Sequence, residues 1–160
     1  MGAEKVTRIL VQEADFDTGA EVARLTAGRT DVGGIGCFVG TVRDTAAGHP
    51  IVALTLEHYP AMTERALAGI ANEAARRWEL LGCTIIHRVG RLVAGANIVL
   101  VLAASENRQP ALEATAFLID WLKTKAPFWK KEELAGGGEA WVEARESDAQ
   151  AAAHWQGQER

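Results

Sequence analysis

Four lysines lie within nine residues of a chain whose formal net charge is −4: Lys123, Lys125, Lys130 and Lys131. The first two fall in the expected last turn of a helix. The last two follow Pro127, which must end that helix because proline lacks the N–H group and clashes with the preceding turn. The rigid apolar segment 127–129 separates the two pairs. We therefore expect two sets of ammonium groups around one place, where an anion binds.

The alternative is that these lysines only serve the helix end and the surface. Cations at a helix C-terminus are stabilised by the macrodipole by about 0.3–1 kcal/mol, and a single lysine is usually solvated. That explains Lys123 and Lys125, but it explains neither Lys130 and Lys131 nor the aromatic residues beside them. Because crowding and partial burial disfavour the ammonium form, one lysine of the cluster could act as a base or as a nucleophile toward an acyl group.

Two arginines stand at the ends of expected elements, Arg43 after a strand and Arg108 before a helix. The guanidinium fork suits a phosphate or carboxylate group, and the helix N-terminus beside Arg108 adds free N–H donors. Arg108 and Lys123 lie at opposite ends of the same helix, on the order of 22 Å apart at about 1.5 Å per residue. One subunit would not easily bring both to a small ligand, whereas a site shared across a dimer interface would.

Length and composition indicate one compact domain, because 160 residues with 48% hydrophobic content can bury a substantial core. The acidic balance argues against a generic nucleic-acid binder. Cys37 and Cys83 lie in separate apolar strands and are expected to be buried free thiols in a reducing compartment. The four histidines form no zinc-binding pattern, so we predict neither a metal nor a cofactor.

The N-terminal residues do not have the form of a signal peptide. No apolar run approaches the roughly 18 residues that a membrane-spanning helix needs. We therefore expect a cytoplasmic protein without a membrane segment.

The periodicity predicts an α+β fold with a mixed or antiparallel sheet, three main helices and the order β-α-β-β-α-β-β-α-β. The expected strands are 6–11, 31–44, 51–58, 84–92, 98–104 and 139–144. The run 98–104 is almost continuously apolar and indicates a central strand buried on both faces. A polar, mobile loop is expected at 45–50, and the loop 93–97 is expected to close a hairpin.

The first helix should begin with a capping box at Thr18 and Glu21, and the second should run from Tyr59-Pro60 to Gly82. The third should begin near Pro110. Its expected inner face is Leu112, Ala116, Ile119 and Leu122.

We expect one domain over residues 1–145. Residues 146–160 should then form a polar tail, for which fraying is favoured over docking.

Several segments resemble the MoaE family, the large, catalytic subunit of molybdopterin synthase. The matching segments are Phe38-Val-Gly-Thr-Val-Arg43, Leu54-Thr-Leu-Glu-His-Tyr-Pro-Ala-Met62, Ile86-His-Arg-Val-Gly90, Leu122-Lys-Thr-Lys-Ala-Pro-Phe-Trp-Lys-Lys-Glu132 and Trp141-Val-Glu-Ala-Arg-Glu-Ser147. They follow one another in the family's order.

The resemblance implies an α/β-hammerhead-like fold and a sulfurtransferase reaction. In this family, sulfur arrives as a thiocarboxylate on the C-terminal glycine of a ubiquitin-like small subunit, MoaD. It is inserted into cyclic pyranopterin monophosphate (precursor Z) to form the dithiolene of molybdopterin. The implied assembly is a homodimer of large subunits within a heterotetramer.

By position, the resemblance implies that Lys123 and Lys130 are the catalytic pair. Lys123 would lie by the partner's terminal glycine as an acid–base group or transient acyl acceptor, and Lys130 would assist proton transfer at the pterin. The implied substrate-binding residues are Arg43, Arg108, Lys131 and Arg145. The implied channel for the partner's tail is formed by Phe38, Pro127, Phe128 and Trp129.

Two positions depart from the family pattern. Asn107 stands where the family usually has histidine, and an amide cannot shuttle protons by titrating. Ala96 follows Gly95 where the family often has an acidic residue. His58, His87 and Glu57 lie in or beside matching segments and are interpreted as structural residues.

Two other functions stay open at this point. A non-catalytic member would keep the fold as a pterin-binding or scaffold subunit, and substitution of Lys123 would then leave synthesis unchanged. A lysine Schiff-base enzyme acting on a phosphorylated carbonyl compound would be trapped by borohydride.

Overall fold

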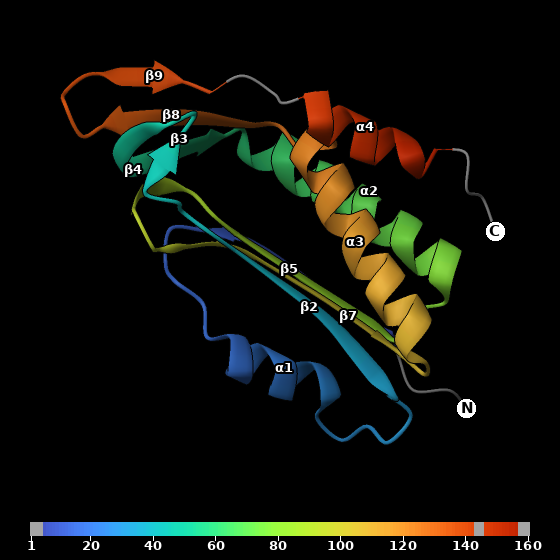
Figure 1. Ribbon diagram of the computed structural model, residues 1–160. Helices are drawn as coiled ribbons and strands as arrows, with labels where there is room; N and C mark the ends of the chain where they lie inside the picture. The colour runs from blue at the N-terminus through green and yellow to red at the C-terminus, as the bar shows by residue number, and fades with distance from the viewer. Residues whose placement is uncertain (1–4, 143–145, 157–160) are drawn as a thin grey trace.

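The computed structural model describes residues 5–142 and 146–156, and within them the chain forms two β-sheets and four α-helices (Figure 1). The first sheet has four strands in the order β1-β5-β7-β2. β1 and β5 are parallel, whereas β7 is antiparallel to both of its neighbours. The strands are β1 (Val6–Gln12), β2 (Gly34–Thr41), β5 (Gly82–Arg88) and β7 (Asn97–Ser105). The predicted α+β class with mixed sheets is confirmed.

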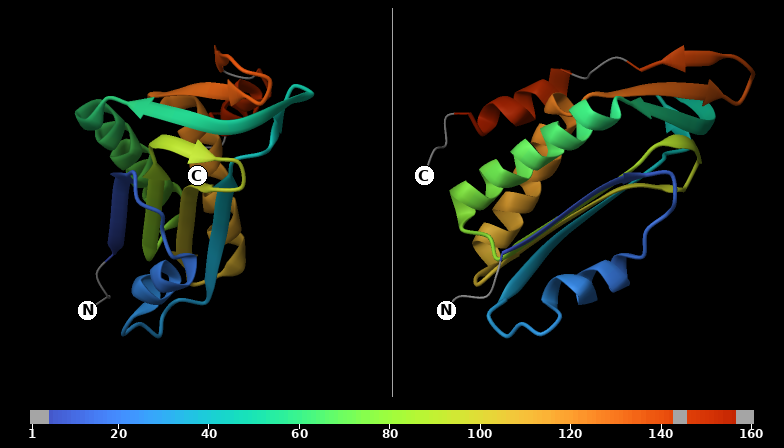
Figure 2. Two further views of the ribbon diagram at one scale, coloured as in Figure 1. Left: turned by 90° about the vertical axis from the view of Figure 1, so that its left-hand side faces the viewer. Right: turned by 180° about the vertical axis from the view of Figure 1, so that it is seen from behind.

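The second sheet lies against one end of the first (Figures 1 and 2). Its main path is β3-β4-β8-β9, and β6 pairs with the other edge of β4. All of its pairings are antiparallel. The strands are β3 (Thr45–Ala46), β4 (His49–His58), β6 (Gly90–Val93), β8 (Phe128–Leu134) and β9 (Glu139–Trp141).

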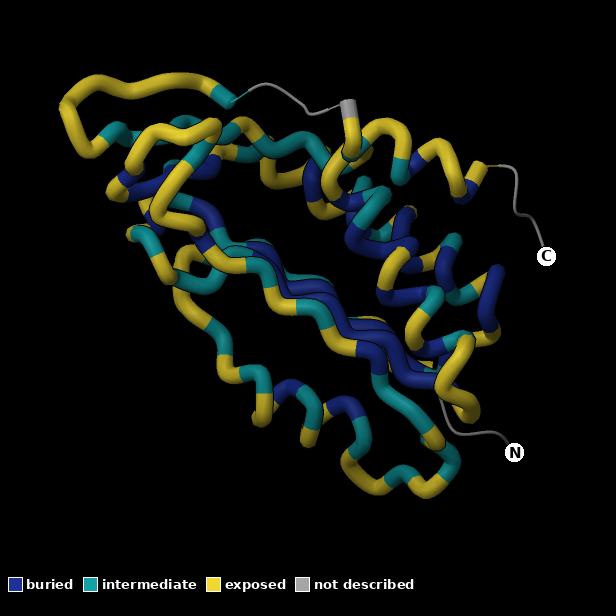
Figure 3. Tube along the Cα trace, viewed as in Figure 1, coloured by how far each residue is buried: buried dark blue, intermediate teal, exposed yellow. Residues whose placement is uncertain are grey.

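Helices cover both faces of the first sheet, with α1 on one side and α2 and α3 on the other (Figure 2). β7 contributes to both resulting cores. Val99, Val101 and Ala103 face α2 and α3, and the alternate residues 100, 102 and 104 face α1. The predicted central strand buried on both faces is confirmed, and its burial is visible in Figure 3. The helices are α1 (Thr18–Thr26), α2 (Pro60–Trp78), α3 (Arg108–Lys125) and α4 (Glu146–His154).

The expected single strand 84–92 is wrong, because the chain breaks it into β5 and β6. The break is at Gly90, whose φ of +86° is easily reached only by glycine. The amide of Val89 still donates to Gln12 at 2.9 Å. The chain then leaves the first sheet and pairs with β4 in the second. The loop 93–97 therefore connects two sheets instead of closing a hairpin within one, although β5 and β7 are antiparallel neighbours.

The expected starts and ends of two helices are also wrong. α1 is capped by Asp17, whose carboxylate accepts from the Ala20 amide at 3.0 Å, and the Glu21 carboxylate binds Arg8 at 2.9 Å instead of completing a capping box. α2 ends at Trp78, because Glu79 adopts the left-handed conformation with φ of +50°. The loop expected at 45–50 is a short hairpin in which β3 pairs with the start of β4.

α3 presents a different face to the sheet from the one expected. Ile119 and Leu122 are buried, but Leu112 is 60% exposed. The helix approaches β2 so closely that a Cβ atom at Gly36 would overlap the Ala111 carbonyl and the Thr115 hydroxyl. Small residues therefore face β2 at this close approach, and the buried residues of the helix are Ala111, Ala114, Thr115, Phe117, Leu118, Ile119 and Leu122.

The described part of the C-terminal segment folds onto the core, so the expectation of a frayed tail is wrong. Trp155, just after α4, is 7% exposed. Its ring packs edge-on at 5.5 Å from Trp78 and 5.9 Å from Phe117, and its indole N–H donates to the Asp120 carboxylate at 2.8 Å. None of the described helices combines the length and apolar character that a membrane crossing requires.

Candidate active site

The second half of the lysine segment, from Phe128 onward, forms strand β8, which the sequence did not predict, whereas Lys123 and Lys125 end α3. β8 pairs with β4, so that Phe128 lies opposite His58 and Lys130 opposite Leu56. Side chains alternate along a strand. Phe128 and Lys130 therefore emerge on one face of β8, and Trp129 and Lys131 emerge on the other.

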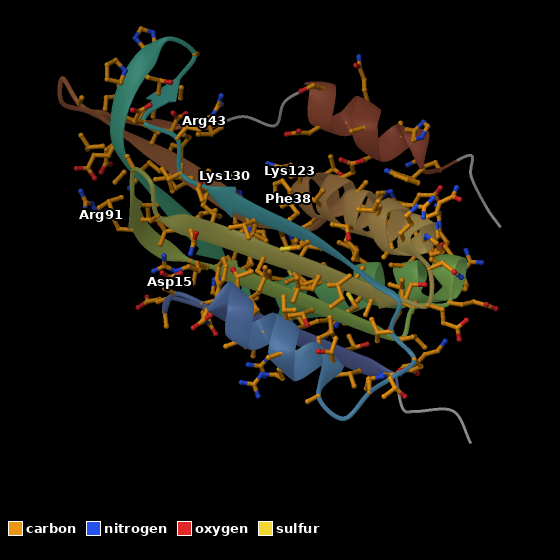
Figure 4. All side chains as sticks on the ribbon, turned by 60° about the horizontal axis from the view of Figure 1, so that its bottom comes forward. Asp15, Phe38, Arg43, Arg91, Lys123 and Lys130 are labelled. Carbon is orange, nitrogen blue, oxygen red and sulfur yellow. The ribbon has the colours of Figure 1, made fainter. Side chains whose placement is uncertain are left out.

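Lys123 and Lys130 meet at two adjoining cavities of about 330 and 270 Å³. Lys123 comes from the last turn of α3, Lys130 from β8, and Arg43 from the segment after β2. Figure 4 shows these three cations close to one another, with Phe38 beside them. Both cavities are lined by Thr41, Arg43, Ile98, Lys123, Phe128 and Lys130.

The two cavities differ in chemistry beyond the shared residues. The larger one extends to the polar side chains of Thr45, Glu132 and Asp148, the last of which comes from α4. The smaller one is bounded mainly by apolar groups from β2, β7 and α3, including Phe38 and Val99. A charged chamber and an apolar chamber thus share a wall that carries three cations.

His87 forms part of the smaller cavity, and sequence reasoning gave it a structural role only. Its ring stacks on Phe128 with 3.8 Å between centroids and 16° between planes. The pKa of His87 is lowered to about 3, chiefly by burial and to a smaller extent by the nearby charges of Lys130, Lys123 and His58. A hydrogen bond to the Arg88 carbonyl acts in the opposite direction. The ring is therefore neutral at physiological pH.

Lys125 and Lys131 point away from this place, so the expectation that all four lysines surround it is wrong. Lys125 Nζ lies 4.6 Å above the Trp121 ring. Lys131 Nζ lies 3.2 Å from a Glu139 carboxylate oxygen and 5.4 Å from the centre of the Trp141 ring. Both ammonium groups have local partners, and neither lines the two cavities formed by the described residues.

The four predicted channel residues also divide. Phe38 and Phe128 line the smaller cavity, whereas Pro127 and Trp129 line neither cavity of the described chain. The Pro127 carbonyl accepts from the buried Thr63 hydroxyl at 3.1 Å, which fixes the joint between α3 and β8. Trp129 is 43% exposed and contacts Tyr59 edge-on at 4.8 Å.

Arg108 is the first residue of α3, at the opposite end of the helix from Lys123. Within the described residues of one chain it does not reach either cavity. Asn107 precedes it as the N-cap, and its side chain makes no capping hydrogen bond. The remaining predicted residue, Arg145, lies outside the described residues.

The cysteines lie apart from this chemistry. Cys83 is buried, and burial raises the pKa of its thiol to about 12. Cys37, expected to be buried, is exposed on β2.

The sequence did not single out Glu132 or Asp148, because each is an ordinary polar residue until the second sheet and α4 bring it to the cavity.

These features define an α+β protein with a two-chambered cationic cavity at the junction of its sheets. The family model described as MoaE protein matches residues 11–125, and the chain belongs to this family.

Relatives match over almost the whole chain. The molybdopterin synthase catalytic subunit of Mesorhizobium japonicum is 51% identical, over 97% of this chain and 97% of that one. Its namesake from Escherichia coli is 50% identical, over 93% of this chain and 98% of its own. A solved structure of the molybdopterin biosynthesis MoaE protein from Burkholderia ambifaria is 47% identical, with a TM-score of 0.80, and the match covers 94% of this chain and 99% of that one. The family resemblance seen in the sequence is confirmed.

Proposed function

We propose that this chain is the catalytic subunit of a molybdopterin synthase. It transfers sulfur from the C-terminal thiocarboxylate of a MoaD-like small subunit to cyclic pyranopterin monophosphate, and so forms the dithiolene of molybdopterin. The observation that carries the proposal is the convergence of Arg43, Lys123 and Lys130 on the wall shared by two cavities. Relatives of about 50% identity that bear the name of this catalytic subunit support it.

The larger cavity suits the phosphorylated pterin. Arg43 presents a guanidinium group that can bind a phosphate through two hydrogen bonds. The carboxylates of Glu132 and Asp148 lie on the same lining and can accept hydrogen bonds from the N–H groups of a pterin.

The smaller cavity suits the extended tail of the partner, because its apolar walls admit a narrow chain that ends in glycine. Phe38 and Phe128 are the predicted channel residues that line it. A tail entering here would present its terminal thiocarboxylate to the shared wall, where the pterin meets it. The Pro127 carbonyl accepts from Thr63 and so fixes the joint between α3 and β8. Trp129 is exposed, where it could contact the body of the partner.

The two lysines at the shared wall would carry the chemistry. Lys123 would act as an acid–base group, or as a transient acyl acceptor, beside the partner's terminal glycine. Lys130 would assist proton transfer and stabilise negative charge at the pterin. Two cations fixed at a wall partly shielded from water stabilise developing negative charge more strongly than they would in bulk water.

A homodimer within a heterotetramer would complete the site. Arg108 lies too far along α3 to serve the cavity of its own chain, so we propose that it serves the cavity of a second copy. Lys131 and Arg145 remain weaker candidates for substrate binding, and Lys131 would first have to leave Glu139. The cytoplasm is the proposed compartment.

Reconstitution tests the function. The purified protein is mixed with precursor Z and thiocarboxylated small subunit, and molybdopterin is assayed for the wild type, for Lys123→Ala and for Lys125→Ala. We expect product from the wild type, a loss of about 10²-fold or more in Lys123→Ala, and near-normal product from the Lys125→Ala control, since Lys125 points toward Trp121.

Equal activity of Lys123→Ala and the wild type would contradict the assignment of Lys123. No product from the wild type, despite a stable complex with the small subunit, would favour a scaffold role and make Asn107→His the first reversion to test. Borohydride trapping in the presence of substrate would instead indicate a Schiff-base enzyme.

A further inference from the structure

His87 lies at the end of β5 with only 3% of its surface exposed, and the function proposed above gives it no part. Four elements contribute charged, titratable or hydrogen-bonding groups around its ring. They are His58 from β4, Lys123 from α3, Lys130 from β8 and the Arg88 carbonyl from β5 itself. His87 therefore lies near both proposed catalytic lysines and needs a physical account.

The orientation of the ring follows from its hydrogen bond. His87 Nδ1 lies 2.8 Å from the backbone oxygen of Arg88. A carbonyl oxygen can only accept, so Nδ1 carries the proton. In a neutral ring this leaves Nε2 with a free lone pair as an acceptor.

The Nε2 atom is not completely enclosed by protein. Within the described part of the chain, the ring is hydrogen-bonded through Nδ1 alone. Every fully buried side-chain nitrogen and oxygen of the described residues has a hydrogen-bond partner. Nε2 is therefore not fully buried, and the space that His87 borders is the smaller cavity.

Lys130 is the cation best placed to use this acceptor. It is two residues from Phe128 on the same strand, so both side chains emerge on the same face of β8. Phe128 is the residue on which the His87 ring stacks, at 3.8 Å. The Lys130 side chain thus rises beside the ring and lines the same cavity.

We propose that in solution the Lys130 ammonium group turns to donate a hydrogen bond to His87 Nε2, so that His87 is a positioning residue that holds this group at the wall between the two cavities. The Arg88 carbonyl fixes the tautomer that makes this possible, and Phe128 fixes the plane of the ring. Because the ring stays neutral, it holds the lysine without adding a third positive charge to the wall. The effect of His87 on catalysis rests on the proposed sulfur transfer. The hydrogen bond between His87 and Lys130 does not depend on that function.

Two substitutions separate positioning from packing. In His87→Asn the amide nitrogen takes the place of Nδ1 and can still donate to the Arg88 carbonyl, but nothing stands at the place of Nε2. In His87→Gln the amide group reaches the place of Nε2 and its oxygen can accept from Lys130. Both variants lose the stacked ring, so both should lower the melting temperature by similar amounts.

The first readout is the kinetics of sulfur transfer with the complete complex. We expect His87→Asn to lower kcat by about tenfold, the effect of one hydrogen bond to a charged group, with little change in KM. His87→Gln should recover most of that loss. Equal loss in the two variants would overturn the proposal, because a packing role predicts it.

The second readout needs no activity. Nitrogen-15 NMR of the wild type should show His87 protonated at Nδ1 and unprotonated at Nε2. The signal of the Lys130 side-chain nitrogen should change in His87→Asn and return toward the wild-type position in His87→Gln. Protonation at Nε2, or a Lys130 signal that is the same in all three proteins, would overturn the proposal. If the wild type makes no molybdopterin, the proposed function fails and this readout alone decides the role of His87.

Discussion

Replacing Trp155 by alanine should destabilise the protein strongly, because this residue joins α4 to the core. It is 7% exposed and packs against Trp78 and Phe117. Its backbone oxygen accepts from the buried Arg77 guanidinium at 2.6 Å, and its indole N–H donates to Asp120 at 2.8 Å.

The magnitude follows from the buried area. A buried tryptophan removes about 150–250 Å² from water, which corresponds to roughly 4–6 kcal/mol at about 25 cal/mol per Å². Truncation of a core tryptophan to alanine typically costs about 3–5 kcal/mol. Because α4 can detach instead of leaving a cavity, we expect the lower part of this range, about 3–4 kcal/mol. Trp155→Phe keeps most of the ring and loses the bond to Asp120, so it should cost only about 1–2 kcal/mol.

Urea unfolding followed by circular dichroism measures these free energies. Trp141→Ala is the control, since Trp141 is 57% exposed and its loss should cost less than about 1 kcal/mol. If Trp155→Ala costs no more than Trp141→Ala, the docking of α4 contributes nothing to stability and the reasoning is refuted.

Two further predictions concern the fold. Gly36→Ala should lower the melting temperature by several degrees, because the added Cβ atom would overlap the Ala111 carbonyl. Gly69→Ala is the control, since nothing lies within 4 Å of its Cβ position. Equal effects of the two substitutions on the melting temperature would contradict the close approach of α3 to β2. Hydrogen bonds from Arg76 and Arg77 hold the pKa of Glu73 at about 2, below its usual 4.5. The ionised carboxylate therefore stabilises the fold fully above pH 4.5, and this contribution is lost as the pH falls toward 2. The difference in unfolding free energy between wild type and Glu73→Gln should shrink across that window, and a constant difference would show that the ion pairs do not form in solution.

The sequence predicted those elements whose pattern reflects burial alone. β7 is apolar at consecutive positions because both of its faces are covered. The rise of α3 likewise predicted that Arg108 and Lys123 could not meet within one subunit, and the structure places them at opposite ends of the helix.

The inner face of α3 was predicted only in part, because its spacing followed the larger apolar side chains. The helix instead turns its small residues to β2, where Gly36 allows close contact and Leu112 is left exposed. The large apolar residues of α3 that are buried lie elsewhere on the helix, at Phe117, Leu118, Ile119 and Leu122.

The position of Lys130 in a strand could not be predicted from the sequence either. Phe128–Leu134 has four charged residues among its seven, a composition that indicates a surface segment, yet it lies between β4 and β9 with both edges paired. Its four charged side chains alternate between the two faces of the strand, and each is only partly exposed. Once the segment is a strand, its period of two decides the chemistry. Phe128 and Lys130 turn toward His87 and the cavity, and Lys131 turns toward Glu139. The proximity of four lysines in the sequence therefore says less about the site than the pairing of one strand, which only the tertiary structure reveals.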